Sequence, residues 1–144
     1  MLTAPAWSNT GLPEKRFTLE EANAALAEVR PLAERMVEVR RELTETTAKL
    51  ERRRLAVAGN GGGLSVQETQ ELQELAVEQG MELARCIEAI AEIGAQVKDL
   101  DRGLLDFPAQ RDGEDILLCW HVGEDEIRYW HGLDEGFAGR KPLG

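Results

Sequence analysis

The feature that most constrains the fold is a pair of apolar repeats separated by a run of glycines. In residues 18–57 and again in residues 72–97, apolar side chains recur at alternating steps of three and four, the spacing of a coiled-coil seam. Between them, residues 58–63 read Ala-Gly-Asn-Gly-Gly-Gly, which cannot continue a helix. The sequence therefore predicts a long antiparallel helical hairpin over residues 17–95, with its turn at 58–64. The seams comprise Val29, Leu32, Met36, Val39, Leu43 and Leu50, then Leu72, Ala76, Gln79, Leu83, Cys86, Ile90, Ile93 and Val97.

Two local motifs predict where these helices begin. Thr18-Leu-Glu-Glu21 and Ser65-Val-Gln-Glu68 each place a hydroxyl three residues before a glutamate, the pattern of a capping box. Pro31 lies inside the first helix, where it removes one backbone hydrogen bond and predicts a kink.

The pattern changes at residue 96, where short β-type runs replace the helical period. Residues 115–121 and 126–131 predict two strands joined by a turn at 122–125, and residues 97–100 and 104–107 predict two shorter strands. We expect residues 96–144 to form a small antiparallel sheet packed on the hairpin, which makes the chain an α+β protein. Residues 1–16 predict an N-terminal arm, with Trp7 as its expected anchor.

Charge and hydropathy bear on partners and location. The chain has 144 residues, a formal net charge of -10 and a pI near 4.7, which disfavours nucleic acid and anionic membranes as partners. No apolar stretch approaches the about 20 residues of a membrane helix, and the start lacks the pattern of a signal peptide. The sequence therefore predicts a cytoplasmic protein. Its two cysteines, Cys86 and Cys119, stand among apolar residues and predict buried thiols.

Several segments together resemble a known family. They are Phe-Thr-Leu-Glu-Glu-Ala-Asn at 17–23, Val-Lys-Asp-Leu at 97–100, Gly-Leu-Leu-Asp-Phe-Pro at 103–108, Leu-Cys-Trp at 118–120, Tyr-Trp-His at 129–131 and Gly-Phe-Ala-Gly-Arg at 136–140. Over about residues 17–142 the chain resembles the bacterial family called domain of unknown function 2203. The resemblance implies a small bacterial cytosolic protein, and it supplies neither a reaction nor catalytic residues.

The motifs of common cofactor sites do not match. The glycine run at 59–63 lacks the lysine of a phosphate-binding loop and follows a helix instead of a strand. The predicted helices contain no histidine, which excludes a ferritin-like di-iron centre. We therefore expect no cofactor.

The predicted strand register argues against a metal site. If the turn centres on residues 123–124, paired residue numbers sum to 247, so that Cys119 faces Arg128 and His131 pairs with Ile116. His131 then lies on the face opposite Cys119 and His121. Those two share a face, but two ligands are too few for a structural zinc site, although a bulge would change the register. Cys119 and His121 stay as an alternative metal pair, and we expect folding to need no metal.

The C-terminal loop is the sequence's candidate ligand site. His131, Asp134 and Arg140 lie close together in it, Trp130 supplies an aromatic wall, and Asp106 could approach if the short strands pair. A histidine near a carboxylate can move protons, and an arginine can bind an anion. The alternative is structural, with Asp134 and Arg140 forming a salt bridge that closes the loop.

Three functions are therefore open. The favoured one is a non-enzymatic interaction or assembly protein, because a small sheet leaves apolar helix faces that a homodimer or another protein could cover. The second is a small anionic-ligand-binding protein or enzyme with its site at the C-terminal loop. The third is a metal-binding protein that uses Cys119 and His121.

Overall fold

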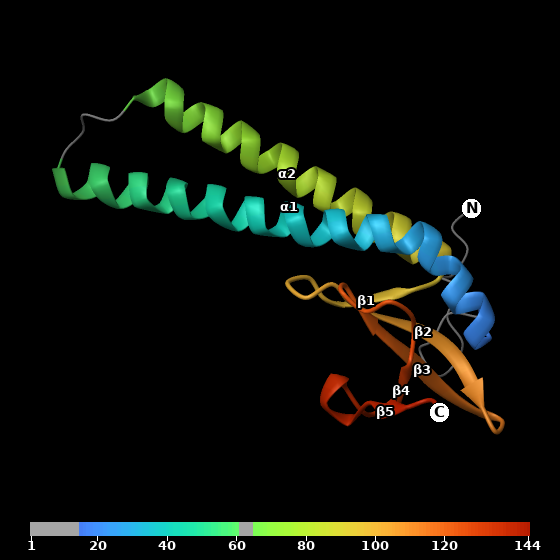
Figure 1. Cartoon of the computed structure of the whole chain (residues 1–144). Coiled ribbons are helices and arrows are strands. Elements are labelled where there is room, and N and C mark those ends of the chain that lie inside the picture. The colour runs from blue at the N-terminus through green and yellow to red at the C-terminus, as the bar shows by residue number, and fades with distance from the viewer. Residues whose placement is uncertain (1–14, 61–64) are drawn as a thin grey trace, which may run out of the picture.

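The structure, a computed structural model, describes residues 15–60 and 65–144, and it confirms the predicted α+β architecture. Helices α1 (Leu19–Asn60) and α2 (Val66–Ile93) form the antiparallel hairpin, and a five-stranded antiparallel sheet follows (Figure 1). Helix α1 runs three residues beyond the predicted end at 57. The last four residues of the predicted turn, 61–64, and Trp7 of the arm lie outside the described residues.

The capping residues explain where both helices begin. The Glu21 amide donates to Thr18 Oγ1 at 3.0 Å and the Thr18 amide donates to Glu21 Oε1 at 2.9 Å, which completes the first box. At the second helix the Glu68 amide donates to Ser65 Oγ at 3.2 Å, and the Glu68 carboxylate pairs with Arg53 of α1. Helix α1 continues through Pro31, and its N-terminal part curves over the sheet (Figure 1).

The sheet has the simple order β1-β2-β3-β4-β5, with every neighbouring pair antiparallel. The predicted strand at 126–131 is wrong in its bounds, because β4 begins only at Tyr129 and the connection before it spans residues 122–128. A short 3-10 helix, η1 (Phe137–Gly139), precedes the last strand. The strands are β1 (Gln96–Asp99), β2 (Leu104–Arg111), β3 (Glu114–His121), β4 (Tyr129–Gly132) and β5 (Lys141–Pro142).

The predicted register between β3 and β4 is wrong by one residue. Leu117 pairs with His131 and Cys119 pairs with Tyr129, so paired numbers sum to 248 instead of 247. The reason is that the connection is not a tight turn at residues 123–124. Because successive side chains in a strand point to opposite faces, one residue of slip moves His131 to the face that carries Cys119.

Helix α1 holds the long connection in place. Asn23 Oδ1 accepts from the Ile127 amide at 2.8 Å, and Arg30 donates to the carbonyl oxygens of Glu124 and Asp125 at 2.9 and 2.6 Å. Ile127 is buried in the core as a result. These bonds join residues about one hundred positions apart, and no local pattern of the sequence contains them.

The core lies between the inner face of the sheet and the near half of the hairpin. Phe107 and Trp120 are fully buried there, together with Met36 and Ile90 from the helices. Phe17 packs edge-on against Phe107, with ring centroids 5.3 Å apart, and its amide donates to the Pro108 carbonyl at 2.7 Å.

The far half of the hairpin has almost no core. We call residues 40–60 and 65–82 the distal hairpin; among its described residues only Thr46 is buried. The two helices diverge toward their far ends (Figure 1). Neither helix of the described part of the chain contains an apolar stretch of the length and hydropathy that a membrane span needs.

We predict that the two halves of the α1 seam differ in stability. Met36→Ala removes a fully buried side chain and should lower the free energy of unfolding by about 2–5 kcal/mol. Leu50→Ala, at a half-buried seam position of the distal hairpin, should cost less than half as much. Urea unfolding of dilute protein checks this, and equal losses would contradict the uneven core.

Candidate functional site

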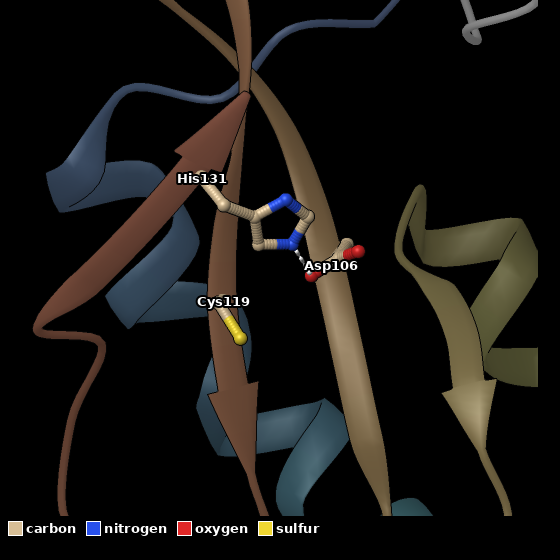
Figure 2. Close-up of side chains that lie close together, drawn as sticks. All are labelled: Asp106, Cys119 and His131. Atoms are coloured by element: carbon tan, nitrogen blue, oxygen red, sulfur yellow. Dashed lines mark hydrogen bonds and ion pairs between the residues drawn. The ribbon is translucent and has the colours of Figure 1, made fainter. Parts of the chain in front are cut away.

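The outer face of the sheet, opposite the helices, carries three buried side chains that could ligate a metal ion. They are Asp106 on β2, Cys119 on β3 and His131 on β4, with exposed fractions of 2, 0 and 3% (Figure 2). Asp106 pairs directly with Cys119 across the sheet, and His131 pairs with Leu117, two residues before Cys119. One carboxylate oxygen, the sulfur and one ring nitrogen all lie within 4.8 Å of one another.

The hydrogen bonds of His131 assign the proton on its ring. Nδ1 lies 2.9 Å from the Gly132 carbonyl oxygen, which can only accept, so Nδ1 carries a hydrogen and donates it. In the neutral ring, Nε2 then presents a lone pair. It lies 3.0 Å from Asp106 Oδ1, toward which the ring points in Figure 2. A lone pair and a carboxylate oxygen repel each other at this distance, so a positive species, a proton or a metal ion, must lie between them.

Burial dominates the electrostatics of the other two groups. It raises the pKa of Asp106 above its ordinary value of 3.8, against the opposing effects of His131, Lys98 and a hydrogen bond from Cys119. Burial, together with the charge of Asp106, raises the pKa of the Cys119 thiol to about 11. Without a bound cation the thiol is therefore protonated at neutral pH.

Arg140 lies beside the thiol, in an arrangement that corrects one expectation. Its Nη1 is 4.0 Å from Cys119 Sγ and 3.1 Å from Glu124 Oε1, and its guanidinium lies over the rings of Tyr129 and Phe137, 4.0 and 4.3 Å from their centroids. The predicted Asp134–Arg140 salt bridge is wrong, since Arg140 pairs with Glu124 while Asp134 is exposed.

A hollow of about 320 Å³ opens beside the cluster, and both Asp106 and His131 line it. It is large enough for several waters or a small ligand. Its other lining residues are apolar, charged or glycine: Leu104, Leu117, Leu133 and Phe137, then Lys98, Asp99, Arg102 and Glu135, and Gly136.

The residues singled out in the sequence are divided between the two faces of the sheet. His131 and Asp106 meet, and Arg140 reaches Cys119. Trp130 lies opposite Leu118 and packs against the helix-side core, on the other face from His131. His121 shares the outer face but bonds the Val122 carbonyl through Nδ1 at 2.8 Å, outside the three-residue cluster.

The sequence reasoning missed the combination of Cys119 with His131. One signal could have revealed it, namely Ile127. An apolar residue in a supposed polar hairpin needs a place in the core, and burying it requires a long connection instead of a tight turn.

Residues 15–143 match the sequence profile of the uncharacterized conserved proteins called DUF2203. The chain belongs to this family. The match confirms the resemblance drawn from the motifs and spans every described element. Neither a curated protein nor a solved structure matches the chain. A functional argument therefore has to come from the buried side chains of the site itself.

We predict that Arg140 is coupled to Glu124 and not to Asp134. Both partners of the Glu124 pair are only 16% exposed, so a double-mutant cycle with alanine should give a coupling energy of about 1–3 kcal/mol in thermal unfolding. The matched cycle on Asp134 and Arg140 should give a coupling energy near zero. A larger coupling energy for Asp134 with Arg140 than for Glu124 with Arg140 would instead support the salt bridge predicted from the sequence.

Proposed function

We propose that the protein binds one transition-metal ion of the zinc class through Asp106, Cys119 and His131. The observation that carries this proposal is the contact between His131 Nε2 and Asp106 Oδ1, because it requires a positive species, a proton or a metal ion, and the sulfur of Cys119 lies close enough to serve as a third ligand of a metal ion. Histidines that bind metals usually donate their other ring N–H to a carbonyl or carboxylate, as His131 does to Gly132.

The separations of the three donors support a tetrahedral ion. Zinc bonds of about 2.0–2.3 Å place neighbouring ligand atoms about 3.3–3.6 Å apart. Nε2 and Oδ1 are 3.0 Å apart, and one ring nitrogen, one carboxylate oxygen and the sulfur all lie within 4.8 Å of one another. Side-chain shifts of about 1 Å would bring all three atoms to bonding distance.

The donor types and their charges also favour such an ion. Imidazole nitrogen, thiolate sulfur and carboxylate oxygen together suit a borderline-soft cation better than calcium or magnesium. A divalent ion with the thiolate of Cys119 and the carboxylate of Asp106 is neutral overall, which suits a buried site. Arg140, next to the sulfur, would further stabilise the thiolate.

The hollow supports a fourth, exchangeable ligand. Structural zinc sites have four protein ligands, whereas catalytic sites have three and a water. Among the described residues three side chains converge here, and two of them line the hollow of about 320 Å³. Metal binding with one open position is thus the function that the geometry supports best. Assembly through the hairpin, which the sequence favoured, is a second proposal, supported by the exposed apolar side chains of the distal hairpin.

We predict one zinc or cobalt ion per chain, which elemental analysis after dialysis against the metal will measure. Asp106→Asn, Cys119→Ser and His131→Gln should each lower the affinity by at least tenfold, because each removes a ligand. Cys86→Ser and His121→Gln are the matched controls, since they change the other cysteine and the other histidine, and should bind like the unchanged protein. In cobalt-loaded protein, the cobalt–thiolate absorption should be absent from Cys119→Ser and present in the variants that keep Cys119.

Two results would contradict the proposal. One is a protein that binds no metal while it is folded, as judged by circular dichroism. The other is an equal loss of metal in the ligand variants and in the matched controls.

We also predict that metal affinity rises with pH. The pKa of the Cys119 thiol is raised to about 11, so binding at neutral pH must displace its proton. A second proton leaves the contact between Asp106 and His131. Each metal ion that binds should therefore release at least about one proton, and the metal affinity should increase at least tenfold per pH unit between pH 6 and 8. Calorimetry in buffers of different ionisation enthalpy counts the protons, and an affinity independent of pH would exclude Cys119 as a ligand.

A further inference from the structure

The distal hairpin exposes apolar side chains that the rest of the chain does not cover. Among the described residues, eight large hydrophobic side chains are exposed, and six of them lie here: Leu55, Val57, Val66, Leu75, Val77 and Met81. A long helical hairpin without a core is only marginally stable in water, because most of the stability of a helix comes from packing its apolar face against other elements. This part of the molecule therefore needs a further layer.

A groove between the diverging helices shows what shape that layer must have. Its volume is about 660 Å³, and Ala56, Leu72 and Leu75 give it an apolar floor. Lys49, Arg52 and Arg53 line it from α1, whereas Glu68 and Glu71 line it from α2, and Arg53 already pairs with Glu68. An apolar floor between a basic and an acidic wall fits a helix or helical hairpin with the same division of charge.

The chain itself has that division of charge. In the distal hairpin, residues 40–60 of α1 contain six Lys or Arg and three Glu, while residues 65–82 of α2 contain five Glu and no Lys or Arg. Some of these charges already pair within the chain, among them Arg53 with Glu68 and Arg54 with Glu51. The excess of basic residues on α1 and of acidic residues on α2 is nevertheless complementary when α1 of one copy lies along α2 of another. A two-fold axis produces this arrangement twice, because each surface patch then meets the same patch of its partner.

We infer that the distal hairpin docks on the distal hairpin of a second copy, as an antiparallel four-helix bundle. The inference rests on the proposal of assembly through the hairpin, for which it names the partner. It does not depend on the metal proposal, since the three proposed ligands lie on the outer face of the sheet and not in this part of the hairpin. The occupant is a second copy because each copy supplies both the basic and the acidic helix that the groove requires.

The size of the surface sets the expected strength. Helical segments of about 20 residues are about 30 Å long, and two helices side by side are about 20 Å wide, so each copy would bury about 600 Å². The total of about 1,200 Å² is at the lower end of specific interfaces. The dimer should therefore form at micromolar concentration and weaken at high salt, since its charge pairs are exposed to solvent.

Two matched variants test the inference in the full chain. Leu75 in the groove and Leu19 at the start of α1 have the same exposed fraction, 41%. Sedimentation equilibrium should show a dimer for the unchanged protein and for Leu19→Gln. Leu75→Gln should raise the dissociation constant at least tenfold. Each variant is first checked by circular dichroism and thermal unfolding, and each experiment is run with and without zinc.

Two outcomes overturn the inference. The first is a monomer at all concentrations up to the millimolar range, which would leave a different protein as the occupant of the groove. The second is a dimer that Leu75→Gln does not weaken, which would place the contact elsewhere on the molecule.

Discussion

The contacts between helix α1 and the connection from β3 to β4 determine the chemistry of the outer face of the sheet. Asn23 and Arg30 form hydrogen bonds with three backbone groups of this connection, and the Trp120 indole donates to the Glu124 carbonyl at 3.0 Å. Held in this way, the connection spans seven residues and sets the register of β4. A slip of one residue would put Trp130 on the outer face and His131 against the helices.

The two faces of the sheet bury very different side chains. The inner face supplies Phe107 and Trp120 to a dry core whose stability comes from removing apolar area from water. The outer face buries an ionisable group from each of three strands, and burying such groups is costly unless each has a partner. Asp106, Cys119 and His131 find those partners in one another, and Arg140 with Glu124 forms a second ionic pair beside them. A set of mutually dependent ionisable groups in a small protein is better explained by ligand chemistry than by stability, because apolar residues would serve stability equally well.

The molecule thus has two separate regions that the stability of the single chain does not explain. The outer-face cluster has three side chains that we propose bind a metal ion, and the distal hairpin has exposed apolar side chains that we propose contact a second copy. They lie on different elements, so they can be tested independently. Together, the two proposals describe a DUF2203 protein with a metal-binding sheet carried on a helical dimerisation arm.

Local interactions allowed the sequence by itself to determine the helical hairpin, its two starting points and the presence of a following sheet. A capping box such as Thr18 with Glu21 spans four residues, and a seam repeats every seven, so both can be recognised in a short window. The motifs also pointed to His131, Asp106 and Arg140 as residues of interest. Only the tertiary structure decided that Cys119 joins His131, that Arg140 pairs with Glu124, and that Asp134 is exposed. The physical reason is that a strand alternates its faces with every residue, and its register here depends on hydrogen bonds to a helix about one hundred residues away.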